Sequence, residues 1–272
     1  MPRISLGLEY DGSAFAGWQW QRERRTIQAC VEDAVSKVAA ERVDVVCAGR
    51  TDAGVHALEQ VVHFDTSARR EMRSWLLGTN TELPEDVRVL WAREVDGEFH
   101  ARYSAIARFY RYVILNRPMK SALLRRQVTW HYHELDVERM QEGATHLIGE
   151  HDFSSFRAQG CQSKSPRRIM HFIQVRREGE RVVIELAANA FLHHMVRNIA
   201  GVLMEIGSGK QAPAWAEAVL AARDRKLAGV TAPPDGLYLG GVYYAERFGI
   251  PRHPVFDRLP ANASRYVPPA HE

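Results

Sequence analysis

Strand-like and helix-like patterns alternate through the first hundred residues. Apolar side chains occupy every second position over residues 4–10, which predicts a strand that ends in the turn at residues 11–13. Apolar residues then recur at helical spacing over residues 27–38, with Thr26 as the predicted N-cap. Further strands are predicted at 43–47, 60–64 and 87–94, and a further helix at 70–77. These elements predict an α+β unit with helices on one face of a sheet.

A second set of similar patterns follows. Residues 105–115 alternate as a strand, 137–147 are spaced as a helix with Asp136 as N-cap, and 169–176 with 181–187 form a predicted hairpin. Helices are predicted at 191–206, ended by Gly207, and at 215–222, before a strand at 237–244. Because strand, helix and strand pair occur twice, we expect two similar halves with a cleft between them.

These patterns divide the chain into three predicted parts. The first domain is assigned to residues 1–104 and the second to 105–247, each a mainly antiparallel sheet with helices on one face. Residues 248–272 contain five prolines and no periodicity, which predicts a tail that wraps the surface or is partly loose.

The composition is that of an ordinary globular chain. Its 272 residues are 46% hydrophobic and 25% charged, and no apolar run approaches the ~20 residues of a membrane helix. The N-terminus enters a strand pattern at once, so we expect no signal peptide, no membrane and a cytoplasmic location. Cys30, Cys47 and Cys161 are odd in number and far apart, which favours reduced structural thiols over a disulfide framework.

Basic and aromatic residues gather locally although the net charge is only +3. Such clusters suit an RNA groove, because cations neutralise phosphates and rings stack on bases. For any one cluster, a solvated basic face over core aromatics is an equally good interpretation. The clusters are Arg22, Arg24 and Arg25 after Trp18 and Trp20; Arg102, Arg108 and Arg111 among Tyr103, Phe109, Tyr110 and Tyr112; and Lys164, Arg167 and Arg168.

The most informative segment is residues 47–56, which place Asp52 in a loop between two predicted strands, two residues after Arg50. Gly49 and Gly54 allow a sharp turn and the close approach of a ligand. Taken alone, an aspartate in such a loop more often forms an ordinary Asx turn.

The whole string from Cys47 to His56 resembles the signature of the tRNA pseudouridine synthase A family. Similar segments occur in the same order elsewhere, so the resemblance extends to about Tyr244. They are residues 4–19 (ISLGLEYDGSAFAGWQ), 99–112 (FHARYSAIARFYRY), 153–156, 191–198 (FLHHMVRN) and 236–242 (GLYLGGV).

The resemblance implies isomerisation of uridine to pseudouridine, with Asp52 as the essential carboxylate. Its targets would be uridines at positions 38, 39 and 40 of the tRNA anticodon stem-loop. Whether the carboxylate attacks the sugar, adds to the base or assists an elimination stays open. The retained uracil is itself the leaving group, so one carboxylate can serve where a glycosidase needs two.

The resemblance also assigns roles to four binding residues. Arg197 matches the arginine that pairs with the catalytic aspartate, and Arg50 matches an RNA contact that holds the extruded nucleotide. Tyr110 matches the tyrosine that stacks on the target uracil, and Leu237 closes the other side of the pocket. From spacing alone, Arg197 is a helix-surface residue, while Tyr110, Tyr112 and Leu237 suit a core equally well. Phe109 and Trp20 replace residues that are commonly polar or basic.

Histidine pairs raise the question of a metal, but their spacing argues against one. His131 and His133 share a strand, His193 and His194 adjoin a helix start, and no third ligand has recognisable spacing. We therefore expect capping or core roles, no metal and no small-molecule cofactor. The family forms homodimers in which one tRNA touches both subunits, so a homodimer is expected here by resemblance.

Two rival functions remain open at this point. One is a non-catalytic RNA-binding protein or RNA chaperone on the same scaffold, which would not need the acid. The other is a metal-dependent nucleoside hydrolase, which would release free uracil and lose activity when metal is removed.

Overall fold

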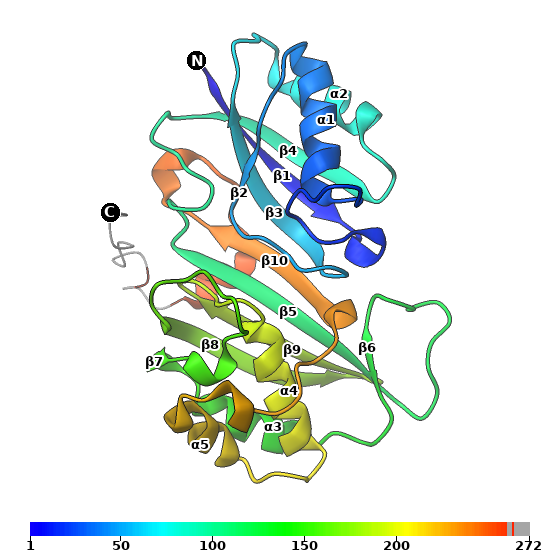
Figure 1. The fold of residues 1–272 in the computed structure, drawn as a ribbon, viewed down its shortest axis with the longest axis vertical. Coiled ribbons are helices and arrows are strands. Elements are labelled where there is room, and N and C mark those ends of the chain that lie inside the picture. Colours follow the sequence, from blue (N-terminus) through cyan, green and yellow to red (C-terminus); the bar gives the residue numbers. More distant parts are fainter. Residues whose placement is uncertain (260–262, 264–272) are drawn as a thin grey trace. The chain divides into compact units, whose positions relative to one another are not determined.

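The computed structural model describes residues 1–259 and 263, and it divides into two compact units (Figure 1). The first unit holds Met1–Ile106 and Tyr238–Arg258. The second holds Ala107–Leu237 together with Leu259 and Ala263. Each unit contains a sheet and helices, so the predicted α+β class with mainly antiparallel strands is confirmed.

The sheet of the first unit has the strand order β4-β1-β3-β10, with β2 paired to β3. β1 is antiparallel to both β3 and β4, and β2 is antiparallel to β3. β10 instead runs parallel to β3. The strands are β1 (Arg3–Tyr10), β2 (Val46–Cys47), β3 (His56–Asp65), β4 (Val87–Val95) and β10 (Leu237–Tyr243).

Two helices pack on this sheet, α1 (Ile27–Ala39) and α2 (Met72–Glu82). They contact each other, and the ring of Trp75 on α2 lies 5.3 Å from that of Phe64 on β3. Thr26 occupies the N-cap position of α1 as predicted, but its side chain makes no capping hydrogen bond. The predicted N-cap position is therefore correct, although the buried hydroxyl of Thr26 has no partner among the described residues.

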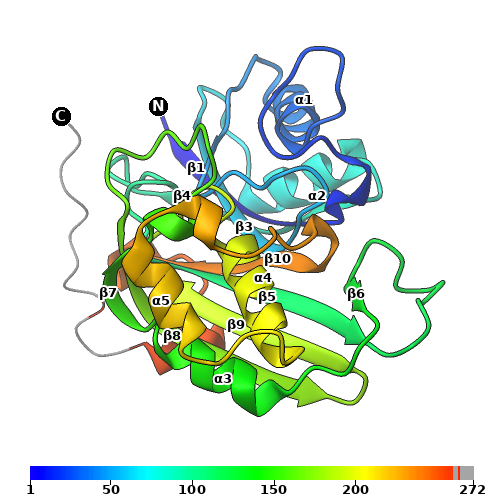
Figure 2. The same cartoon turned by 60° about the horizontal axis from the view of Figure 1, so that its bottom comes forward.

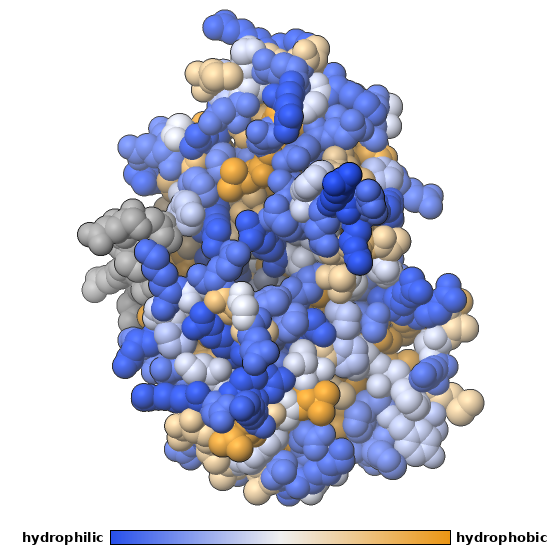
Figure 3. All heavy atoms as spheres, in the orientation of Figure 1, coloured by the Kyte–Doolittle hydropathy of each residue, from blue (hydrophilic) through white to orange (hydrophobic). Residues whose placement is uncertain are grey.

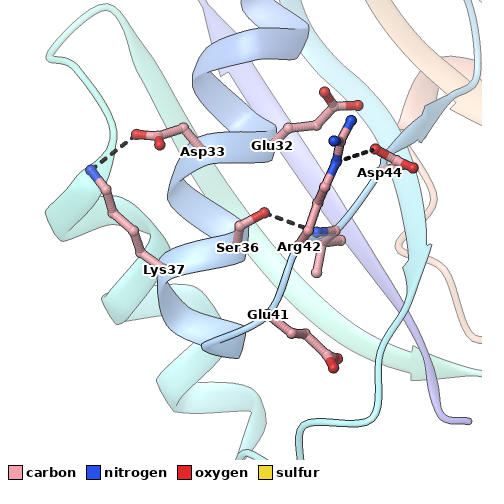
Figure 4. A pocket seen from close by; sticks show the side chains of 8 residues that line it. Glu32, Asp33, Ser36, Lys37, Glu41, Arg42 and Asp44 are labelled. Atoms are coloured by element: carbon pink, nitrogen blue, oxygen red, sulfur yellow. Dashed lines mark hydrogen bonds and ion pairs between the residues drawn. The ribbon is translucent and has the colours of Figure 1, made fainter.

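The strand predicted at residues 43–47 is reduced to the two residues of β2. The backbone N–H of Val43 donates to Ser36 Oγ (2.9 Å), and that of Val45 donates to Glu32 Oε1 (3.1 Å). Both acceptors belong to α1, so this stretch hydrogen-bonds to helix side chains in place of a neighbouring strand (Figure 4). A shallow pocket beside α1 is lined by the carboxylates of Glu32, Asp33 and Glu41. Each of them is hydrogen-bonded or ion-paired to another protein group.

The sheet of the second unit has the order β5-β9-β8-β7, with short β6 parallel to β5. The β8–β9 hairpin is confirmed, and Gly179 in its turn takes a positive φ of 60°. The strands are β5 (Ala107–Asn116), β6 (Thr129–His131), β7 (Gly149–Asp152), β8 (Arg167–Glu178) and β9 (Arg181–Ala188).

Helices α3 (Val137–Thr145), α4 (Met195–Gly207) and α5 (Trp215–Ala222) gather on one side of this sheet (Figure 2). Asp136 caps α3 as predicted, because its side chain accepts from Arg139 N at 3.0 Å. The predicted start of α4 at residue 191 is wrong by four residues. His194 takes a left-handed conformation with φ of 61°, which a continuing helix does not allow.

The compact units also differ from the predicted domain limits at the C-terminal end. Tyr238–Arg258 groups with the first unit, because β10 pairs with β3. Phe256 is fully buried there and stacks on Tyr243 at 5.4 Å, so this part of the predicted tail is packed. The prediction of a wrapping or loose tail beyond Leu259 falls outside the described residues, apart from buried Ala263.

The surface in Figure 3 is mainly hydrophilic with small scattered apolar groups. Scattered exposed apolar residues are normal on soluble domains and need no ligand to explain them. Among the described residues, no helix combines the length and the apolar character that crossing a bilayer requires.

A buried histidine makes the first unit sensitive to acid. His63 on β3 is only 4% exposed, and its Nδ1 accepts a hydrogen bond from Ala101 N at 3.1 Å. Burial lowers the pKa of His63 to about 4, and the charges of His100 and Arg3 act in the same direction.

We expect the free energy of unfolding to fall as the pH drops from about 6.5 to about 4. In this window the unfolded chain binds a proton at His63 that the folded chain excludes, at a cost of at most roughly 3 kcal/mol. Denaturant titrations at pH 7 and pH 4.5 should show a smaller loss for His63→Asn than for wild type. Equal losses in the two proteins would contradict this assignment.

Candidate functional site

Asp52 lies in the loop between β2 and β3, where its side chain is half-buried and that of Arg50 is exposed. The loop turns directly after the acid, because Val55 N donates to Asp52 O at 3.1 Å. Gly54 takes a φ of 79° in this turn, a conformation that favours glycine. The predicted location of the acid between two strands is therefore correct.

The residue before the acid is held on two sides. The Thr51 hydroxyl is hydrogen-bonded to Tyr10 Oη at 2.8 Å, and both side chains are buried. The Thr51 carbonyl accepts from Trp18 N at 2.9 Å. Side chain and main chain of Thr51 are thus both fixed, which leaves the adjacent Asp52 little conformational freedom.

Gln60 on β3 anchors the start of the same loop. Its side chain is fully buried, and Nε2 donates to Gly49 O at 2.6 Å. In the opposite direction, Gly49 N approaches Gln60 Oε1 at 3.4 Å, and Ala48 N donates to Val61 O at 2.8 Å. The loop therefore leaves the sheet at a defined point.

Two glycines near the end of β1 let the neighbouring backbone approach this loop. A Cβ at Gly12 would lie 2.0 Å from the Val55 carbonyl oxygen, and one at Gly17 would lie 2.8 Å from the Thr51 carbonyl oxygen. Gly12 N also donates to Nδ1 of His56, whose ring stacks on Tyr238 at 4.7 Å. The segment before α1 thus packs against both ends of the turn that carries Asp52.

The other predicted site residues lie in the second unit. Tyr110 is half-buried on β5 and its ring meets that of Phe191 edge to face at 4.9 Å. Phe109 points to the opposite face of the strand and is buried near Phe172. Tyr112 lies on the same face of β5 as Tyr110 but is fully buried. Of the two tyrosines that the sequence equally allowed in the core, Tyr112 is therefore the core residue.

Arg197 lies on the first turns of α4 and is paired with the segment that precedes β10. Its Nε donates to Ala232 O at 2.8 Å, and Ala232 N donates back to Arg197 O at 3.1 Å. The side chain is half-buried, in contrast to the exposed helix-surface position that spacing alone suggested. Its guanidinium is therefore oriented by a main-chain carbonyl.

A polar cluster around Asn198 is hydrogen-bonded to the segment that precedes β10. Asn198 is fully buried, and its Oδ1 accepts from Arg225 Nη2 (3.0 Å) and from Thr231 Oγ1 (2.7 Å). Its Nδ2 donates to Phe156 O at 2.7 Å. A Cβ at Gly201 would lie 1.9 Å from Val230 O, so α4 and the segment touch through backbone atoms.

The same segment reaches β5 and then Leu237. Tyr112 Oη donates to Pro233 O at 2.8 Å, and burial raises the pKa of this phenol. Gly236 lies against Val113, where a Cβ would be 2.4 Å from the carbonyl oxygen. Leu237 follows with its side chain 5% exposed. Within the second unit, one segment therefore links the surroundings of Arg197, the Tyr110 strand and Leu237.

The supporting residues carried no recognisable sequence signal. Gln60 lies in a run of strand residues and Arg225 in a stretch without a motif, while Asn198 ends the family-like segment 191–198 but had no role assigned to it. Their importance comes from being buried with hydrogen-bonding partners far away along the chain, which periodicity does not report.

Comparison with known proteins agrees with these motifs. The family model described as tRNA pseudouridine synthase matches residues 8–104 and 144–245. The chain belongs to this family. Its members isomerise uridine to pseudouridine, so the residues above belong to a pseudouridine synthase fold.

Similar proteins from three organisms match nearly the whole chain of this family member. A tRNA pseudouridine synthase A from Methylococcus capsulatus is 70% identical over 98% of this chain and 98% of its own length. The one from Nitrosococcus oceani is 59% identical over 92% of this chain and 96% of its own length. One from Coxiella burnetii is 56% identical over 94% of this chain and 98% of its own length. The pseudouridine synthase likeness therefore includes both compact units.

The anchoring of the synthase loop can be measured by a double-mutant cycle. Tyr10→Phe and Thr51→Val should each destabilise the protein by about 1 kcal/mol or more. Each substitution removes the hydrogen bond between the two side chains and leaves the remaining hydroxyl buried without this partner. The double variant should lose less than the sum, with a coupling of about 0.5–1.5 kcal/mol. Purely additive losses in denaturant midpoints would show that this bond does not hold the loop.

Proposed function

We propose that this protein converts uridines 38, 39 and 40 of the tRNA anticodon stem-loop to pseudouridine, with Asp52 as its essential carboxylate. The observation that carries the proposal is the half-buried acid on an anchored loop in a chain that belongs to the tRNA pseudouridine synthase family. A tRNA substrate follows from the relatives' name, tRNA pseudouridine synthase A, at 70% identity over nearly the whole length.

The chemistry explains why one acid suffices. The bond from C1′ to N1 breaks, the uracil turns, C5 joins C1′, and the C5 proton leaves to solvent while N1 takes up a proton. No water enters, and uracil is a stable anion that remains as the next nucleophile, so a second carboxylate to protonate an alcohol is unnecessary. Asp52 assists by acting on the sugar or the base, and the loop geometry supports a fixed position for it.

Asp52 acts as a carboxylate, so it needs a neighbouring cation in a site that excludes water. Burial alone disfavours the charged form, whereas an opposite charge a few ångströms away favours it. We assign this role to Arg197. The main-chain carbonyl that orients Arg197 supports a guanidinium held ready for a charged partner.

The remaining residues hold a uridine that has left its helix. Flipping a base costs roughly a few kcal/mol, and stacking on an aromatic ring returns about 1–3 kcal/mol. Tyr110 stacks on the uracil and Leu237 closes the pocket on its other side. Arg50 binds the RNA backbone and helps hold the extruded nucleotide, a role supported by its exposed side chain two residues before Asp52. The protein acts in the cytoplasm as a homodimer whose subunits share one tRNA.

The test is tritium release from tRNA labelled at uridine C5. Asp52→Asn should lose release by at least several orders of magnitude while keeping its fold and its affinity for tRNA. Asp44→Asn is the matched control, because Asp44 is a mostly exposed aspartate just before β2 and should leave release unchanged.

Three outcomes would overturn parts of the proposal. Release by Asp52→Asn would remove the acid from the mechanism. Binding of tRNA by wild type without release from any tRNA would favour a non-catalytic RNA-binding protein. Release abolished by a chelator would favour a metal-dependent enzyme.

The target positions can be tested with tRNAs that carry the label at a single site. Substrates labelled at position 38, 39 or 40 should each release tritium, and substrates labelled only in another stem should not. The adjacent targets differ in orientation around the stem, so access depends on the tRNA bending or opening at the pocket. Release confined to a different stem would exclude the anticodon stem-loop as the substrate region.

A further inference from the structure

Between β4 and β5, in the first unit, a short turn is tied firmly to the sheet at its beginning. Arg3 Nη1 on β1 donates to the carbonyls of Gly97 (2.6 Å) and Phe99 (2.8 Å). Phe99 is fully buried and packs on Tyr244 at 5.0 Å. The chain therefore enters this turn in a fixed position.

The next residues are anchored with similar strength. Ala101 N donates to His63 Nδ1 at 3.1 Å, and Ala101 O accepts from Tyr244 Oη at 2.6 Å. Ser104 closes the turn, because its N–H donates to His100 O and its hydroxyl accepts from His100 N. Ala101 is fully buried, whereas the two residues after it are not.

Those two residues, Arg102 and Tyr103, form an exposed cation and ring at the tip of the turn. Tyr103 is 42% exposed although its neighbours in sequence are fixed. His100 stacks on one face of its ring, with centroids 4.2 Å apart and planes at 24°. Nδ1 of the same histidine accepts from Arg102 N and Tyr103 N, each at 3.2 Å. The ring is therefore held while a large part of it faces solvent.

The Arg102 guanidinium lies over the Tyr103 ring at 5.5 Å, which is within cation–π range but beyond a packed contact. The charges of Arg50 and Arg102 both act on the buried Cys47 thiol at the end of β2. They oppose the burial that raises the pKa of this thiol to about 12. Both cations therefore lie within electrostatic range of Cys47.

Neighbouring residues of the same basic and aromatic run have structural roles instead. Arg108 donates to Asn189 O at 3.0 Å, and Arg111 is paired with Glu178 at 3.2 Å. Phe109 and Tyr112 are buried. Tyr103 differs from them because its exposed ring is held by the His100 stack and has a guanidinium over it.

We propose that Arg102 and Tyr103 form a binding site for one RNA nucleotide other than the uridine that reacts. Its base stacks on Tyr103, and its phosphate pairs with Arg102. The proposal rests on RNA being the substrate, as proposed above, and adds a contact outside the pocket of the flipped base. A ring already fixed by His100 loses little freedom when a base stacks on it, so the contact is preorganised.

The test compares tRNA binding and turnover by the full-length protein and its variants. Tyr103→Ala should raise Kd and KM for tRNA by about 5- to 100-fold, the range expected for one stacked base, with a smaller effect on kcat. Tyr103→Phe should restore affinity, because the ring is retained. Arg102→Gln should reduce the slope of log Kd against log salt by about one, as expected for one lost phosphate contact.

The matched control is Tyr132→Ala, which removes a tyrosine that is 54% exposed in the second unit and should leave Kd unchanged. Thermal unfolding of each variant checks that the turn has not collapsed. Equal Kd for Tyr103→Ala and Tyr103→Phe, with intact folds, would overturn the site. So would an equal loss in Tyr132→Ala.

Failure of this proposal and failure of the proposed function give different results. Wild type that binds tRNA without releasing tritium refutes the activity, and a Tyr103→Ala loss of affinity then still supports the nucleotide site. Normal tritium release with no effect of Tyr103→Ala or Arg102→Gln on Kd or salt dependence refutes the site alone.

Discussion

The loop that carries Asp52 depends on buried polar side chains of the adjacent strands. Tyr10 and Gln60 each place a hydrogen-bonding group where an apolar residue would fill the same space. Leaving either group unpaired in the core would cost about 1–3 kcal/mol, so the loop conformation that satisfies them is strongly preferred. The position of the Asp52 backbone is therefore restricted, because other loop conformations would leave these groups unpaired.

The second unit applies the same principle to a cation. Arg197 is oriented by a carbonyl of the segment before β10, and that segment is supported by Asn198 and Arg225. Asn198 is satisfied only when three separate stretches of chain meet at its amide. In both units, therefore, buried hydrogen-bonded residues restrict where a charged side chain can be, as preorganised sites require.

The local pattern predicted those elements whose stability is local. Alternation located β1 and the β8–β9 hairpin, and Asp136 capped α3 as its position implied. Failures occurred where distant atoms compete for the backbone. Residues 43–45 leave the strand pattern because Ser36 and Glu32 accept their N–H groups, and α4 starts late because His194 is left-handed.

For the candidate site, sequence resemblance identified Asp52 and Arg197 as residues, but the hydrogen bonds that hold them were not predictable. Gln60 and Gly49 are eleven positions apart, and Arg225 is further still from Asn198. Such pairs are recognised only once the chain is folded, since hydrogen-bonding capacity is common to many polar residues and partners are set by packing.

The parallel pairing of β10 with β3 has a consequence for biosynthesis. His56 leaves the ribosome long before Tyr238, its partner in register, and the intervening ~180 residues take roughly ten to forty seconds to translate. Until then the start of β3, at His56 and Ala57, lacks its parallel partner, and unpaired strand edges invite association with other chains. The first unit thus begins to be made first but receives β10 late, so chain elongation sets the earliest moment at which the strand after the Asp52 loop has both of its long neighbours.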